Sequence, residues 1–208
     1  MKYKLIIFDF DGTLADTFPW FINAINNVAD KYSFKRIDNS EVATIRGYSA
    51  KRVLKHLKIP FWKVPVIAKH MKTLMAKDTS KIELFTSVDL MLQQLSTSNV
   101  QIALVSSNSY DNISQILGFE NLSLIDFHEC SVSIFGKPSK LRKILIKSGV
   151  NKSEAIYIGD EIRDIEAANK VNMSSGAVSW GYNTIEKLKE KLPDEIFYTV
   201  NEIPIKLA

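Results

Sequence analysis

The sequence predicts an α/β fold, a doubly wound parallel sheet with an inserted α-helical domain. Through most of the 208 residues, short apolar runs alternate with segments of helical periodicity, as in a parallel sheet covered by helices on both faces. The first run, residues 5–8, is continuously apolar, which is typical of a strand buried on both faces. Residues 16–81 show no strand pattern, so we expect a core domain of residues 1–15 and 82–208 and a helical domain of residues 16–81.

The helical domain begins where Asp16 or Thr17 can cap a helix that tolerates Pro19 in its first turn. Gly47 interrupts the periodicity, and Ser49 can cap the next helix. The expected helices of this domain cover residues 16–34, 41–45, 49–57 and 65–77.

Alternation of strands and helices returns after residue 81. Thr86 and Asp89 resemble a capping box, Gly118 is expected to end one helix, and Gly149 is expected to close another. The expected helices cover residues 86–95, 109–117, 138–148 and 162–170. The expected strands cover residues 101–105, 125–130 and 155–158, with 176–179 as the final core strand. The pattern after Pro193 predicts no element.

Composition favours an ordinary globular protein, with 46% hydrophobic and 24% charged residues. The net charge of +4 gives a weak bias toward anionic ligands, but the lysines are scattered, so no nucleic-acid partner is expected. A single cysteine, Cys130, excludes an internal disulfide and suits a reducing compartment. We see no signal peptide and no apolar run that could span a membrane, and we expect a cytoplasmic protein.

Two acids follow the first apolar run. Burying an unpaired carboxylate costs several kcal/mol, so Asp9 and Asp11 should lie at the carboxyl end of the strand with a cation nearby. Residues two apart on a strand point to the same side, so both carboxylates could face one ligand. Ligands of such sheets bind beyond the carboxyl ends of the strands.

The stretch from Asp9 to Leu14, Asp-Phe-Asp-Gly-Thr-Leu, resembles the first motif of the phosphatases in the haloacid dehalogenase (HAD) superfamily. Three further motifs follow in the order of that family. They are the strand that ends in Ser106, the lysine in Gly136-Lys137-Pro138, and Gly159-Asp160 with Asp164 four residues later. The resemblance implies a Rossmann-like HAD core, with the helical domain as its small cap.

The resemblance also implies catalytic roles. Asp9 matches the nucleophile that forms an aspartyl-phosphate, and Asp11 matches the general acid and base. It implies a Mg²⁺ cofactor bound by Asp9, by Asp160 and by the backbone carbonyl of Asp11. Asp164 matches the second acid, which orients the lysine or reaches the metal through water. It could instead, or in addition, stabilise the first turn of its helix.

Three residues match phosphate-binding positions of the family. Ser106 would hydrogen-bond the transferring phosphoryl group, with Ser107 as a further donor, and Lys137 would neutralise its charge. Ser107 could alternatively cap the following helix, and Lys137 could be an ordinary solvated lysine. The family pattern is variable at Glu161 and Arg163, so neither receives a role.

In the cap, Trp20 and Arg46 are candidates for substrate contact. Arg46 could pair with a substrate carboxylate, as the resemblance to phosphoglycolate phosphatase-like members implies. Its alternative is an exposed charge at a helix end.

We therefore expect a magnesium-dependent phosphatase that is monomeric and hydrolyses a small phosphomonoester, such as phosphoglycolate, through an aspartyl-phosphate. A phosphomutase of the beta-phosphoglucomutase type shares all four motifs and remains an alternative, as does a non-catalytic phospho-ligand-binding module. A true dehalogenase is disfavoured because it would lack the acid at Asp11.

Overall fold

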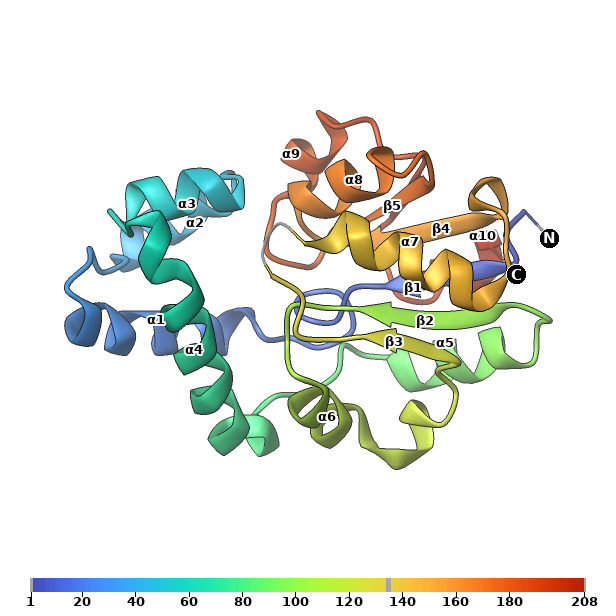
Figure 1. Cartoon of the computed structure of the whole chain (residues 1–208), viewed down its shortest axis with the longest axis horizontal. Helices are drawn as coiled ribbons and strands as arrows, with labels where there is room; N and C mark the ends of the chain where they lie inside the picture. Colours follow the sequence, from blue (N-terminus) through green and yellow to red (C-terminus); the bar gives the residue numbers. More distant parts are fainter. Residues whose placement is uncertain (1, 134–135, 208) are drawn as a thin grey trace.

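The centre of the molecule is a parallel sheet of six strands in the order β3-β2-β1-β4-β5-β6 (Figure 1). The computed structural model of the chain describes residues 2–133 and 136–207. The strands are β1 (Leu5–Phe8), β2 (Gln101–Val105), β3 (Phe127–Glu129), β4 (Ala155–Gly159), β5 (Ser174–Val178) and β6 (Glu195–Phe197). Strand order reverses at β1, and in doubly wound sheets the ligand site lies at such a switch point.

Strand β1 is buried along its whole length, as its apolar run predicted. Ile6 and Phe8 belong to one hydrophobic cluster, and Leu5 and Ile7 belong to another, because successive side chains point to opposite faces of the sheet.

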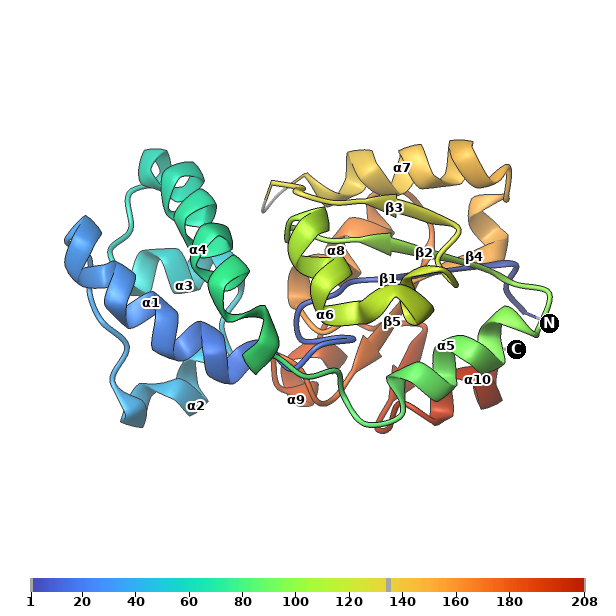
Figure 2. The ribbon, with the colours of Figure 1, turned by 90° about the horizontal axis from the view of Figure 1, so that it is seen from below.

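Helices cover both faces of the sheet (Figure 2). Apolar residues of α5 (Val88–Ser96), α6 (Tyr110–Leu122) and α10 (Glu202–Leu207) pack in the cluster of Ile6 and Phe8. Apolar residues of α7 (Lys137–Ser148) and α8 (Ile162–Asn169) pack in the cluster of Leu5 and Ile7. Helix α9 (Ile185–Lys189) packs against α8 and β5. The predicted α/β fold class is confirmed.

Four helices between β1 and α5 lie to one side of the sheet, beyond the carboxyl end of β1 (Figures 1 and 2). They are α1 (Phe18–Tyr32), α2 (Val42–Ile45), α3 (Ala50–His56) and α4 (Val64–Asp78). Their buried side chains, such as Ile25, Leu57 and Ile67, form a hydrophobic cluster separate from those on the sheet. This separate core supports the division at residues 16 and 81, which we propose as the domain boundary.

Two expectations about local structure were wrong. Helix α5 is not opened by a capping box of Thr86 and Asp89, because its N-cap residue is Ser87, with φ of 71° and no capping side-chain bond. The strand expected at 176–179 is β5 and is not the last, since β6 and α10 follow Pro193.

Gly118 ends the regular helix that begins α6, as expected. Its backbone is non-helical, with φ of 77° and ψ of 163°, and a second short helical segment of α6 follows this kink up to Leu122.

No helix in the described ranges is both long enough and apolar enough to cross a membrane.

Candidate active site

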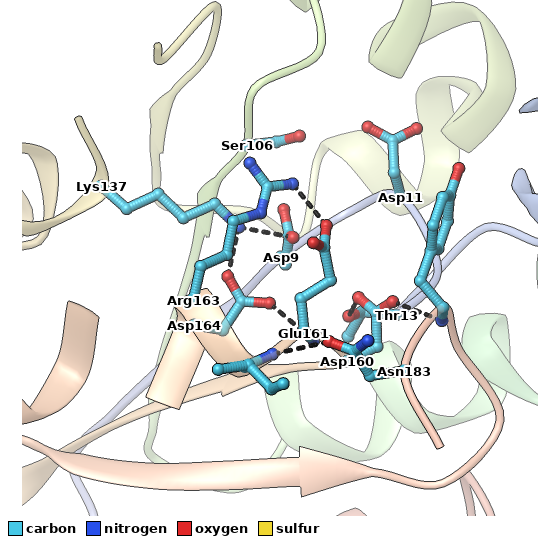
Figure 3. Close-up of polar contacts among 12 residues, drawn as sticks. Asp9, Asp11, Thr13, Ser106, Lys137, Asp160, Glu161, Arg163, Asp164 and Asn183 are labelled. Atoms are coloured by element: carbon cyan, nitrogen blue, oxygen red, sulfur yellow. Dashed lines mark hydrogen bonds and ion pairs between the residues drawn. The ribbon is translucent and has the colours of Figure 1, made fainter. Parts of the chain in front are cut away.

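Three neighbouring strands place the candidate residues at one edge of the sheet. Phe8, the last residue of β1, is in register with Leu104 of β2 and Ile158 of β4. Parallel strands end at the same edge, so Asp9, Ser106 and Asp160, which directly follow these strands, come together there (Figure 3).

Three buried carboxylates form what we call the acidic cluster, which consists of Asp9, Asp160 and Asp164. Each offers an oxygen atom, and these oxygens all lie within 4.8 Å of one another. Burial raises the pKa of Asp160 well above its usual range, and the charges of Glu161, Asp164 and Asp9 raise it further. Burial also raises the pKa of Asp9 to about 7, although Lys137 acts in the opposite direction. A buried set of hard oxygen donors with excess negative charge fits Mg²⁺.

Lys137 joins two members of the acidic cluster. Its Nζ lies 2.5 Å from Oδ2 of Asp9 and donates a second hydrogen bond to Oδ1 of Asp164. Burial alone would lower the pKa of Lys137, but Asp164 and Asp9 outweigh it and raise the pKa. With 1% of its surface exposed, Lys137 is not an ordinary solvated lysine.

Asp164 has both of the contacts considered from the sequence. One carboxylate oxygen binds Lys137, and the other accepts the backbone N–H of Glu161 at 3.0 Å, at the start of α8. This geometry fixes the lysine and the first turn of the helix together.

Asp11 lies apart from the acidic cluster (Figure 3). Strand β1 ends at Phe8, so the alternation that would direct Asp9 and Asp11 to the same side does not extend to Asp11. Its Oδ1 accepts a hydrogen bond from Nδ2 of Asn108 at 3.0 Å. Burial raises the pKa of Asp11 to about 6, against the effect of Asn108. A carboxyl group with this pKa can hold or release a proton near neutral pH, as a general acid and base must.

Ser106 is fully buried, and its Oγ accepts the backbone N–H of Asn108 at 3.1 Å. Ser107 is half-buried beside it. The cap of α6 (Tyr110–Leu122) is Ser109, whose Oγ accepts the N–H of Asn112, so the alternative capping role of Ser107 is wrong.

Asp160 is held by residues that the sequence did not indicate. Its Oδ1 accepts from the hydroxyl of Thr13 at 2.9 Å, and its Oδ2 accepts from the backbone N–H of Tyr182 at 2.7 Å. A Cβ atom at Gly12 or Gly181 would lie 2.2 Å from an atom of Asp160, so both positions require glycine. The loop that contains Tyr182 carries no motif, which is why only the structure shows its role.

The family assignment rests on a direct comparison with known proteins. The family model described as haloacid dehalogenase-like hydrolase matches residues 6–178. The chain belongs to this family. Phosphoglycolate phosphatases from Synechococcus elongatus (29% identity over 201 residues, covering 96% of this chain and 95% of the relative) and Psychrobacter arcticus (25% over 226 residues, covering 95% and 92%) are similar along nearly their whole length.

Two solved structures show the same fold. A protein from Lactobacillus plantarum has a TM-score of 0.85 at 20% identity, with both chains fully covered. A haloacid dehalogenase-like family protein from Streptococcus pneumoniae has a TM-score of 0.81 at 19% identity, covering 100% of this chain and 99% of the other. The predicted HAD family is confirmed, and so is the prediction of a phosphatase.

The two cap residues proposed for substrate contact are engaged by other protein groups in this HAD protein. Trp20 donates from Nε1 to the carboxylate of Asp78 at 3.0 Å and so joins α1 to the end of α4. Arg46 donates to the backbone carbonyls of Gly181 at 2.6 Å and Tyr182 at 3.2 Å. Arg46 is therefore not a freely exposed charge at a helix end, and its pairing with a substrate carboxylate stays a prediction.

A different cation of the cap lies within electrostatic reach of the site. Lys72, on α4, is half-buried, and burial lowers its pKa while the carboxylate of Asp11 raises it. The turn of α4 that carries it is fixed because Asn112 donates to the carbonyl of Lys72 at 3.1 Å. No sequence motif marks this residue, since Lys72 is one of several lysines along α4.

Proposed function

We propose that the chain is a magnesium-dependent phosphatase that hydrolyses a small phosphomonoester of the phosphoglycolate kind through an aspartyl-phosphate on Asp9. The observation that carries the proposal is the acidic cluster, in which a buried carboxylate lies 2.5 Å from the Lys137 ammonium and within 4.8 Å of two further acids. A nucleophile, a charge-neutralising lysine and a set of metal ligands at one point are the equipment of phosphoryl transfer.

In the proposed reaction, an oxygen of Asp9 attacks phosphorus, and the bond from phosphorus to the leaving oxygen breaks. Asp11 gives its proton to that oxygen, then takes a proton from the water that hydrolyses the aspartyl-phosphate. Lys137 neutralises charge on the phosphoryl group, and Asp164 keeps the lysine in place. Mg²⁺ held by Asp9, Asp160 and the carbonyl of Asp11 would supply further positive charge.

The charge and burial of Lys72 favour a substrate whose leaving group carries a negative charge. Lys72 is a partly desolvated cation on the cap side of Asp11, the residue proposed to protonate the leaving oxygen. A carboxylate near that oxygen would therefore meet Lys72. The relatives named phosphoglycolate phosphatases are consistent with such a substrate.

Steady-state hydrolysis of phosphoglycolate and para-nitrophenyl phosphate, with Mg²⁺ and after its removal by chelation, tests the proposal. We expect turnover only with Mg²⁺, and a loss of about tenfold or more in kcat/KM for phosphoglycolate in Lys72→Met, with a smaller loss for para-nitrophenyl phosphate. Lys69→Met, an exposed position on the same helix, is the matched control.

No metal-dependent turnover of any phosphomonoester would contradict the proposed function and favour the non-catalytic module. If Lys72→Met lowered kcat/KM equally for both substrates, the proposal of a phosphatase would stand. The proposal that Lys72 recognises a negatively charged leaving group would be refuted.

A further inference from the structure

The side chain of Asp11 is held by an asparagine rather than by the sheet. Strand β1 ends at Phe8, and Asp11 is half-buried beyond it, so the strand does not fix its side chain. Asn108, on the loop after β2, is 3% exposed and donates from Nδ2 to Oδ1 of Asp11 at 3.0 Å. Burial raises the pKa of Asp11, and this hydrogen bond is the largest of the interactions that lower it. The amide of Asn108 therefore stabilises the ionised form of the proposed acid and base.

The orientation of this amide is fixed by its own partners. Oδ1 of Asn108 accepts the backbone N–H of Ser109 at 2.8 Å, and a backbone N–H can only donate. The oxygen of the amide must therefore face Ser109, so its nitrogen faces Asp11. The backbone of Asn108 is held as well, because its N–H donates to Oγ of Ser106 at 3.1 Å and its carbonyl accepts the N–H of Ser131 at 2.6 Å. A donor held in this way can direct the carboxylate that it binds.

The same amide contacts the helical domain. Nδ2 of Asn108 also donates to Sδ of Met75, on α4, at 2.9 Å. Asn112, 1% exposed on α6, donates from Nδ2 to Oδ1 of Asn108 at 3.0 Å and to the carbonyl of Lys72 at 3.1 Å. A carbonyl can only accept, so the amide of Asn112 also has a single orientation. The two asparagines therefore form a continuous chain of hydrogen bonds from α4 to Asp11.

We propose that Asn108 is the positioning residue of Asp11 and that Asn112 locks this asparagine to α4 of the helical domain. This inference rests on the proposed function and adds to it two residues that direct the proton transfer. Because Oδ1 of Asp11 accepts from Asn108, the proton of the neutral carboxyl group is carried on Oδ2. The amide aims that group at the leaving oxygen in the first step and at the attacking water in the second. Loss of this orientation slows both steps.

Two substrates separate this role from a general loss of activity. para-Nitrophenolate leaves without a proton, whereas the alkoxide of phosphoglycolate must be protonated as it leaves. kcat/KM includes only the steps up to phosphorylation of Asp9, because release of the leaving group comes before hydrolysis of the intermediate. In Asn108→Ala, we expect kcat/KM to fall about tenfold to a hundredfold for phosphoglycolate and by less than about threefold for para-nitrophenyl phosphate.

Rapid-mixing measurement of nitrophenolate release tests the second step. In Asn108→Ala, we expect a burst of about one equivalent per site followed by slow turnover, because hydrolysis of the aspartyl-phosphate needs Asp11 as the base. Lys72 is proposed to contact only the leaving group, so its loss gives no such burst. Asn112→Ala should show the same pattern with smaller changes, because Asn108 keeps its hydrogen bond to Asp11.

Melting temperature and a matched variant serve as controls. Asn99→Ala, at an exposed position before β2, should keep wild-type kinetics. The Mg²⁺-induced rise in melting temperature should be retained in all three variants, because the acidic cluster is unchanged. If Asn108→Ala fails to fold, Asn112→Ala carries the test.

Equal losses of kcat/KM on both substrates without a burst would overturn the proposal, since Asn108 would then act on phosphate binding or on the fold. Wild-type kinetics in folded Asn108→Ala would overturn it as well. In either case an active wild type leaves the proposed function standing, and only this inference fails. A wild type that hydrolyses no phosphomonoester refutes both.

Discussion

Asp160 shows how a single buried acid can cost stability and yet be retained. It is fully buried, and burial together with Glu161, Asp164 and Asp9 raises its pKa. An isolated buried charge destabilises a fold unless a cation or hydrogen bonds compensate it. Two hydrogen bonds, from Thr13 and Tyr182, compensate only part of this charge. The remaining cost is what a bound Mg²⁺ would offset.

Asp160→Asn should therefore raise the free energy of unfolding of the metal-free protein, by about 1 to 3 kcal/mol. The amide keeps the shape of the carboxylate, and the Thr13 hydroxyl can reverse its role and accept a hydrogen bond. The same variant should lose the Mg²⁺-induced rise in melting temperature, which thermal unfolding with and without the metal measures.

Asp111→Asn, an exposed acid on α6, is the control and should keep the wild-type response to Mg²⁺. An undiminished metal response in Asp160→Asn would show that this residue is not a metal ligand.

The sequence motifs indicated which residues gather at the site, while the roles of these residues stay predictions. The motifs located Asp9, Ser106, Lys137, Asp160 and Asp164, and the structure brings these residues together. The position of Asp11 was not predicted, because nothing in the motif shows that β1 ends at Phe8. No motif marks Lys72, because Asp11, the acid that acts on its charge, lies far from it along the chain.

At the scale of elements, α7 is positioned by one buried acid at the end of β3. Glu129 is 6% exposed and accepts ion pairs from Lys140 at 2.9 Å, Lys143 at 2.6 Å and Lys147 at 2.8 Å. These lysines lie on one face of α7, since they are three and four residues apart. The same helix begins with Lys137, so Glu129 helps to fix the lysine of the site.

Stability should depend on the charge of Glu129. Burial alone would raise its pKa, but hydrogen bonds from Lys143, Lys147 and Lys140 lower the pKa from 4.5 to about 2. A depressed pKa in the folded state means that the stabilisation is complete above the unfolded-state value. It is lost as pH falls from 4.5 toward about 2.

We expect Glu129→Gln to lower the free energy of unfolding at neutral pH by about 1 to 2 kcal/mol, allowing for solvent screening of the lysines. Urea unfolding from about pH 7 to about pH 3 should show the difference from wild type narrowing as the pH falls. Glu190→Gln, in an exposed pair with Lys187, is the control and should change stability by less than about 0.5 kcal/mol. A difference that does not depend on pH would contradict this account.

In the whole molecule, the loop of residues 179–184 after β5 joins the helical domain to the acidic cluster. Arg46 donates to the carbonyls of Gly181 and Tyr182, while the N–H of Tyr182 binds Asp160. Asn183 donates to the carbonyls of Arg46 and Tyr48 and accepts the N–H of Ile162, at the start of α8. The same loop therefore forms hydrogen bonds both to the helical domain and to Asp160, the proposed metal ligand.

The fold class could be predicted from the sequence, but these connections could not. Alternating apolar runs predicted the strands that form the centre of the sheet, because burial on both faces imposes a continuous apolar pattern. Strand β6 was missed since its three residues, Glu195–Phe197, carry too little periodicity. The bonds from Arg46 to Gly181 and Tyr182 join residues far apart along the chain, and no local pattern records such a pairing.

The central claim, that Asp9 carries the phosphoryl group during turnover, is tested most directly by mass spectrometry of Asp11→Asn. This variant is mixed with Mg²⁺ and para-nitrophenyl phosphate, whose leaving group needs no proton from Asp11, and is then quenched. Without the general base, hydrolysis of the aspartyl-phosphate should be slowed, so the protein should gain the mass of one phosphoryl group, and peptide mapping should locate it on Asp9. Release of product at the wild-type rate with no phosphorylated protein, or a phosphoryl group on another residue, would contradict the account.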